Sequence, residues 1–260
     1  MLQSTFCHVP GLGLQTERRL WDAGCLSWAD LLEPDSSWPL GSRQSSEVLR
    51  QIELSQRALE EGVHQHFATL LGSRHAWRAW PEFQDRAVCL DIETDGRQDP
   101  DSITMVGLYD GQEFICLTPD DGLASFPDII SRWGMIVTFY GGGFDLPMLR
   151  KAFPQVRLDQ IHFDLCPAFR QLGVRGGLKK IEVEMGLQRP EEAEGLTGWD
   201  AVLLWRRHLR GDPNALRILT AYNREDVVNL WVLANIAYEK LRKSVGFPGS
   251  HAPLREPETV

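Results

Sequence analysis

A short apolar run that ends in two acidic residues is the strongest constraint on how this chain folds. Residues 87–90 read Ala-Val-Cys-Leu and are followed by Asp91-Ile92-Glu93. The run predicts a buried strand, in which alternate side chains face the same way. Asp91 and Glu93 would then project together, while Ile92 returns to the core. Two such carboxylates repel each other and lose hydration unless a cation such as Mg²⁺ or Mn²⁺ neutralises them. The alternative is a solvated turn, because TDGRQDPDS follows directly.

Further apolar runs after Arg86 predict more strands. Ile103–Tyr109 and Gln112–Leu117 flank Asp110-Gly111, which is a two-residue hairpin signal. Another apolar run, Met135–Tyr140, ends in three glycines, and helical patterns dominate the sequence after it. Strands followed by helices, with a hairpin joined to a strand–loop–helix unit, predict an α/β fold with a sheet of mixed direction.

The first 72 residues predict a small all-helical module. Helices are expected at 15–23, after a cap at Ser27, and as one long helix over 45–71. The turn that contains Gly11 and Gly13, just before the first helix, resembles a helix-hairpin-helix element. In such an element the turn brings backbone amides close to a phosphate. The alternative is a tight turn in a small helical domain.

Composition breaks divide the chain into three segments. We expect the helical module at residues 1–72, the α/β domain at 73–243 and a disordered tail at 244–260. The tail, GFPGSHAPLREPETV, has three prolines and almost no apolar periodicity.

Bulk composition limits the partners and the compartment. The formal net charge of −9 speaks weakly against nucleic acid, because phosphate binding usually relies on Lys and Arg. A carboxylate-rich metal site would account for part of that charge.

No apolar run approaches the ~20 residues of a membrane span, and the N-terminus does not resemble a signal peptide. Five cysteines without a Cys-x-x-Cys pair predict free thiols. We therefore expect a cytoplasmic protein with no membrane partner.

A glycine-rich loop leads into a third acidic position. Gly141–Gly143 follow an apolar strand and precede Phe144 and Asp145, at an expected helix start. A helix N-terminus favours an anion, so Asp145 as a plain cap is the alternative to a ligand. His162 and Asp164, at strand spacing, are expected to be structural rather than catalytic.

The fourth acidic position lies on the last expected helix. Tyr222 and Asp226 are four residues apart, so their side chains share one helical face. Asp226 precedes Leu230, on the apolar face, by one turn. An unpaired carboxylate there would be costly, which favours a ligand role.

In this order, Asp91-x-Glu93, the glycine-rich loop into Phe144-Asp145, and Tyr222-x-x-x-Asp226 resemble the three motifs of the DEDDy 3′–5′ exonucleases. The resemblance covers Ala87 to Leu241. It implies a ribonuclease-H-like mixed sheet flanked by helices. The stretch WRAWPEFQDRAVCLDIETDG and the segments 162–165 and 177–179 are most similar to bacterial YprB-type proteins.

The resemblance also implies a site and a substrate. Two Mg²⁺ or Mn²⁺ ions would clamp the scissile phosphate, and Tyr222 would orient the attacking water. The substrate would be nucleic acid with a single-stranded 3′ end, with DNA favoured over RNA. The implied metal ligands are Asp91, Glu93, Asp145 and Asp226, which with Tyr222 form the catalytic set. The expected nucleic-acid contacts are Thr94, Gly11, Gly13, Phe144 and Lys179.

Some positions depart from the family pattern. Tyr140 stands where the second motif usually has asparagine, and Asp95 and Arg97 replace a common threonine and a common apolar residue. Ala221 stands where the related histidine branch has its histidine.

One alternative function is that of a catalytically inactive nucleic-acid-binding protein on the same fold, against which the intact catalytic set argues. Another is a phosphohydrolase of small nucleotides, which the acidity favours and the helix-hairpin-helix-like turn disfavours.

Overall fold

The computed structural model describes residues 1–34, 37–40, 42–190, 195–249 and 253–257. Five strands form one mixed sheet in the order β3-β2-β1-β4-β5. The central strand β1 is antiparallel to β2 and parallel to β4, β3 is antiparallel to β2, and β5 is parallel to β4. The strands are β1 (Ala87–Thr94), β2 (Ile103–Tyr109), β3 (Phe114–Leu117), β4 (Met135–Thr138) and β5 (Ile161–Asp164). The predicted α/β fold with a mixed sheet is confirmed.

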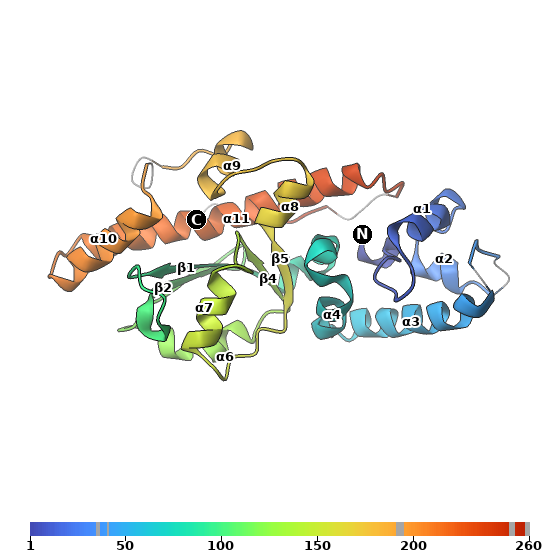
Figure 1. Ribbon diagram of the computed structural model, residues 1–260, viewed down its shortest axis with the longest axis horizontal. Helices are drawn as coiled ribbons and strands as arrows, with labels where there is room; N and C mark the ends of the chain where they lie inside the picture. The colour runs from blue at the N-terminus through green and yellow to red at the C-terminus, as the bar shows by residue number, and fades with distance from the viewer. Residues whose placement is uncertain (35–36, 41, 191–194, 250–252, 258–260) are drawn as a thin grey trace.

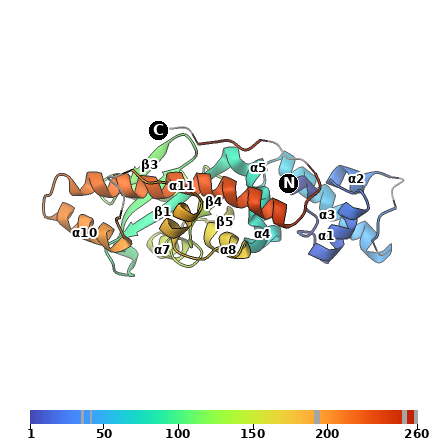
Figure 2. The same cartoon turned by 90° about the horizontal axis from the view of Figure 1, so that it is seen from above.

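Helices cover both faces of this sheet (Figure 1). The 30-residue helix α11 (Ala215–Ser244) runs across one face, and Figure 2 shows it passing over β1 and β4. Helices α6 (Phe126–Ile130) and α7 (Asp145–Ala152) lie on the opposite face. Between β5 and α11 in the chain lie α8 (Leu165–Gln171), α9 (Leu178–Glu184) and α10 (Gly198–Leu209).

Strand alternation divides the core into two parts. Ala87 and Cys89 of β1 belong to the cluster that contains the apolar face of α11. Val88 and Leu90 belong to the cluster on the α6–α7 side. The side chains at 91 and 93 share the parity of 87 and 89, so they lie on the face that α11 covers.

The N-terminal region is helical, as predicted, but its long helix is broken. The expected helix over 45–71 is wrong: α3 (Ser42–Glu60) ends before Gly62, and α4 (His64–His75) begins after it. Gly62 adopts a φ of +68°, and its carbonyl accepts a hydrogen bond from Arg86 Nη1 at 2.7 Å. This left-handed residue ends the helix, because few side chains tolerate that conformation.

The turn at Gly11–Gly13 is followed by α1 (Leu14–Asp22) and α2 (Trp28–Leu32), which Ser27 caps. It is preceded by a single 3₁₀ turn, η1 (Leu2–Ser4), rather than by a full helix. Short 3₁₀ and α turns also connect α4 to the sheet and join its strands. They are η2 (Ala76–Ala79), α5 (Trp80–Phe83), η3 (Gln84–Arg86), η4 (Pro100–Ser102) and η5 (Leu123–Ser125).

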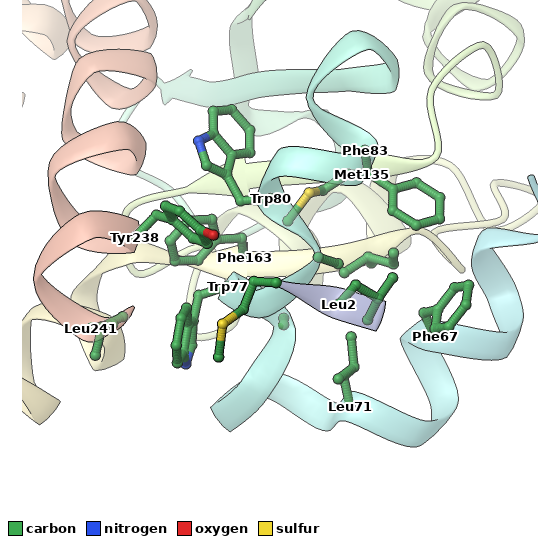
Figure 3. Packing of buried hydrophobic residues seen from close by; sticks show 14 of the residues in the cluster. Leu2, Phe67, Leu71, Trp77, Trp80, Phe83, Met135, Phe163, Tyr238 and Leu241 are labelled. Atoms are coloured by element: carbon green, nitrogen blue, oxygen red, sulfur yellow. The ribbon is translucent and has the colours of Figure 1, made fainter. Parts of the chain in front are cut away.

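One hydrophobic core joins the helical region to the sheet. Leu2 packs in the same cluster as Phe67 of α4, Trp80 of α5, Phe163 of β5 and Tyr238 of α11 (Figure 3). The expected boundary at residues 72–73 coincides with a kink at Gly72 inside α4. The helical region therefore lies directly against the α/β part through apolar packing.

A buried ion pair reinforces this junction. Arg78 Nη1 lies 2.9 Å from Glu17 Oε1, and both side chains are almost fully buried. Glu17 Oε2 also accepts hydrogen bonds from the backbone N–H groups of Phe6 and Cys7, at 2.7 and 3.0 Å. The pair thus connects α1, the N-terminal turn and η2.

The tail differs from the disorder that we expected. The carbonyl of Arg255 accepts hydrogen bonds from Gln84, Trp231 and Asn235 at 3.0–3.1 Å, and its N–H donates to Gln84 Oε1 at 2.8 Å. Phe247 packs against Trp21. Buried polar side chains therefore order this part of the tail despite its composition. Residues 250–252 and 258–260 lie outside the described residues.

Among the described residues, no helix is both long and apolar enough to cross a membrane.

Replacing Arg78 with methionine should destabilise the protein by about 3–5 kcal/mol, because it leaves the Glu17 carboxylate buried without its cation. Chemical denaturation of the two proteins measures the difference. Arg50→Ala is the control, because Arg50 pairs with Glu47 on the surface. An equal effect of the two substitutions would contradict a role for the buried pair.

Candidate active site

The central strand β1 presents its two carboxylates to α11. Asp91 pairs with Gly107 of β2, and the register shifts between Glu93 and Thr94, where a bulge ends the regular ladder. Glu93 is buried and Asp91 is partly buried. Asp91 and Glu93 therefore project from the same face of β1, as the strand alternation predicted.

Helix α11 brings a third carboxylate to the same place. One carboxylate oxygen each from Asp91, Glu93 and Asp226 lie within 4.8 Å of one another. We call these three residues the acidic cluster. Tyr222, one turn before Asp226, is also buried and faces the same space.

Asp145 lies beside the cluster at the first residue of α7. Its Oδ1 accepts a hydrogen bond from the backbone N–H of Ile92 at 3.2 Å. It shares with the acidic cluster a cavity of about 360 Å³, which we call the acidic cavity. The lining residues are Asp91, Ile92, Glu93, Thr94, Phe139, Tyr140, Phe144, Asp145, Gly198, Tyr222 and Asp226.

Asp164 shapes the loop that carries Asp145. Its carboxylate accepts hydrogen bonds from the backbone N–H groups of Tyr140 at 2.7 Å and Gly142 at 3.1 Å. These bonds hold Tyr140 at a φ of +65°, which is uncommon for a residue with a side chain. His162 Nε2 lies 2.9 Å from Thr138 Oγ1 at the end of β4. Both residues make structural contacts here, as we expected.

Burial and mutual repulsion make the four carboxylates hard to ionise. Burial, followed by the charge of Asp226, raises the pKa of Glu93 to about 8. Burial also raises the pKa of Asp145 to about 7 and that of Asp226 to about 6. The pKa of Asp91 is raised well above its usual range by burial and by the other three carboxylates. Such a site favours a cation that would offset the repulsion.

Asn223 is a site residue that the sequence analysis missed. Its Nδ2 donates a hydrogen bond to Asp91 Oδ2 at 2.9 Å and so orients that carboxylate. A Cβ atom at position 107 would overlap Asn223 Oδ1, so glycine opposite Asp91 leaves the space that the Asn223 side chain occupies. Two features of the sequence could have indicated this contact: Gly107 lies inside an apolar strand, and the Asn223 amide is next to Tyr222.

Arg189 is a second missed residue. Its Nη2 donates to Asp226 Oδ1 and, at 2.6 Å, to Glu182 Oε1, while its Nε donates to Glu182 Oε2 at 2.7 Å. Glu182, on α9, is itself buried. The arginine follows α9 and belongs to none of the three motifs that carry Asp91, Asp145 and Asp226, so no sequence signal marks it.

Two cations lie against the ring of Tyr222. Lys179 Nζ is 4.6 Å from the ring centroid, and the Arg189 guanidinium carbon is 5.7 Å from it. Burial and the neighbouring carboxylates raise the pKa of the Tyr222 phenol, so the phenol stays protonated near neutral pH. In the metal-free protein it can therefore donate a hydrogen bond through its hydroxyl.

The expected nucleic-acid contacts fall in two places. Thr94 and Phe144 line the acidic cavity, and Lys179 lies on Tyr222 at its edge. Gly11 and Gly13 precede α1, which lies at the opposite end of the molecule from α10 (Figure 1). Their contact with nucleic acid stays a prediction.

Without metal, the protein should become less stable as the pH rises from about 4.5 to about 8. The pKa of Glu93 is raised from 4.5 to about 8, so the folded state binds a proton there that the unfolded state releases. That contribution is fully present below about 4.5 and is lost as the pH rises through 8. Denaturant unfolding in chelator at a series of pH values measures it. Glu93→Gln should reduce the pH dependence, and an unchanged dependence in this variant would contradict the assignment.

Known proteins place this architecture in a family. A protein-family model described as the RNase_H superfamily matches residues 88–238. No curated protein matches the chain significantly. Among solved structures, the chain is similar to the family B DNA polymerase from the hyperthermophilic archaeon Pyrobaculum calidifontis. The identity is 19% and the TM-score 0.42, over 61% of this chain and 24% of that polymerase. The chain thus spans about a quarter of the polymerase's length. Because the family match covers more than half of the residues and all three acidic motifs, the chain belongs to the ribonuclease H superfamily.

Proposed function

We propose that this protein is a metal-dependent 3′–5′ exonuclease of the DEDDy type, similar to the bacterial YprB-type proteins. The observation that carries the proposal is the acidic cluster, with Asp145 in the same cavity, on a ribonuclease-H-like sheet. The reaction would be hydrolysis of a phosphodiester at a 3′ end, with release of nucleoside monophosphates.

The chemistry of the cavity fits divalent cations. The ligand atoms are carboxylate oxygens, which Mg²⁺ and Mn²⁺ prefer. Glu93 Oε1 is buried and has no hydrogen-bond partner among the described residues, so a cation would satisfy it. Asp91, Glu93, Asp145 and Asp226 would hold two ions, which when bound supply Lewis-acid stabilisation of the charged phosphate.

The protein's own groups would position the reactants. Tyr222, protonated and fixed between its neighbours, would orient the attacking water through its hydroxyl. Asn223 would keep Asp91 oriented before any substrate binds. Lys179 Nζ is buried over the ring of Tyr222 and has no hydrogen-bond partner among the described residues, so it would have to turn away from that ring to donate to a phosphate oxygen.

The rim of the cavity suits an unpaired 3′ end. The side chains of Tyr140 and Phe144 are 51% and 37% exposed, although both are large and line the cavity. Exposed aromatic rings stack on nucleobases with little sequence preference. We therefore favour single-stranded substrates. DNA is favoured over RNA by the helix-hairpin-helix-like turn at Gly11–Gly13, whose backbone amides would contact a second phosphate.

Asp91→Asn and Asp226→Asn should each remove nearly all hydrolysis while the protein remains folded. Each substitution removes a ligand charge and also relieves repulsion within the cluster, so metal-free stability should not fall. The measurement uses DNA and RNA oligonucleotides labelled at either end, with Mg²⁺ or Mn²⁺, and product sizes show the direction of cleavage.

The matched control is Asp120→Asn, an exposed carboxylate far along the chain from the three motifs. Full activity of Asp91→Asn, or of wild type in excess chelator, would disprove the assignment. Binding of oligonucleotides without cleavage would indicate an inactive binding protein. Cleavage of free nucleotides alone would indicate a small-nucleotide phosphohydrolase.

Tyr222→Phe should lower the turnover number by about ten- to a thousandfold, which corresponds to about 1.4–4 kcal/mol of barrier. The ring that packs against Lys179 and Arg189 remains, so only the hydroxyl is lost and substrate affinity should change little. Single-turnover kinetics separate the two quantities. A wild-type rate would show that another group orients the water.

A further inference from the structure

Arg189 bridges two buried carboxylates, one of which belongs to the acidic cluster. Its side chain is only 7% exposed, and it donates to Asp226 and twice to Glu182. Glu182 is 2% exposed and also accepts a hydrogen bond from Asn229 Nδ2 at 3.1 Å. The guanidinium is therefore anchored on the Glu182 side and extends from there to the cluster.

Arg189 can give up its contact with Asp226 more easily than its contact with Glu182. Two parallel N–H···O bonds join Arg189 to Glu182, in the bidentate geometry that gives strong ion pairs. A single contact joins it to Asp226. Loss of that one contact leaves the guanidinium still paired with Glu182, so its charge stays compensated.

Charge makes Arg189 and a metal ion competitors. Arginine remains protonated in proteins, and it lies in contact with a carboxylate whose oxygen is within 4.8 Å of the other two cluster oxygens. A divalent cation held by the cluster would be repelled by this positive charge at short range. Arg189 also withdraws one acceptor of Asp226 from any metal ion.

We propose that Arg189 is the internal counter-ion of the acidic cluster, and that Glu182 sets the metal affinity by controlling how strongly Arg189 holds Asp226. This inference rests on the proposed metal-dependent function. In the metal-free protein Arg189 offsets the repulsion within the cluster. When metal binds, Asp226 passes to the metal and Arg189 keeps its pair with Glu182.

The test measures Mn²⁺ binding to the full-length protein without substrate. Titration calorimetry gives the affinity, and the loss of the electron paramagnetic resonance signal of free Mn²⁺ gives the bound fraction. Among the described residues, Glu182→Gln leaves Asp226 as the only carboxylate that accepts a hydrogen bond from Arg189, so Mn²⁺ should bind about tenfold more weakly. The double variant Glu182→Gln/Arg189→Gln removes both charges and should bind Mn²⁺ about tenfold more tightly than wild type. Arg132→Gln, an exposed arginine, is the control and should not change binding.

Mn²⁺ affinity should fall in Glu182→Gln and rise in the double variant. A purely structural role of Arg189 and Glu182 would instead weaken Mn²⁺ binding in both variants. The double variant should also unfold at a lower temperature in chelator and gain more from Mn²⁺ than wild type does. Equal or weaker Mn²⁺ binding by the folded double variant would overturn the proposal. If the double variant does not fold, unchanged or tighter binding by Glu182→Gln overturns it. Hydrolysis is not a readout, so a wild-type protein that binds Mn²⁺ without cleaving nucleic acid would refute the proposed function alone.

Discussion

Repulsion among buried carboxylates is the constraint on which the rest of this site depends. Asp91, Glu93 and Asp226 bring oxygens within 4.8 Å of one another, in a place where burial limits screening by water. Their raised pKa values express the cost of this arrangement. A fold tolerates such a cost only where the surrounding structure over-determines the geometry. Here the central strand and the longest helix supply that rigidity, because neither can shift without disturbing the core.

The supporting contacts divide between orientation and charge. Asn223 and Gly107 fix the Asp91 carboxylate by close approach of helix to strand. Asp164 fixes the loop before Asp145 by accepting two backbone N–H groups. Arg189 acts on charge, since it neutralises Asp226 while it stays anchored to Glu182. Ligand geometry and ligand charge are therefore controlled by different residues.

The helical region contains a contrasting buried pair. Glu17 and Arg78 balance each other one to one: Arg78 Nη1 contacts both carboxylate oxygens, and Oε2 also accepts two backbone N–H groups. That pair leaves no charge for a ligand and serves to join the N-terminal turn to the sheet. In the acidic cavity the carboxylates outnumber the cations, which is the condition that favours a divalent ion. The same residue types thus serve packing in one place and chemistry in the other.

The sequence by itself determined what depends on neighbours along the chain. Strand alternation placed Asp91 and Glu93 on one face, and a spacing of four placed Tyr222 above Asp226, because backbone geometry fixes both relations. The mixed sheet followed from the order of the apolar runs. Gly62 broke a helix that apolar spacing alone predicted, and Gln84 and Asn235 ordered a tail whose composition indicated disorder. Only the tertiary structure brought Arg189 to Asp226, 37 residues later in the chain. An ion pair of this kind depends on how α9 and α11 pack, and hydrophobic periodicity carries no information about which charged side chains meet.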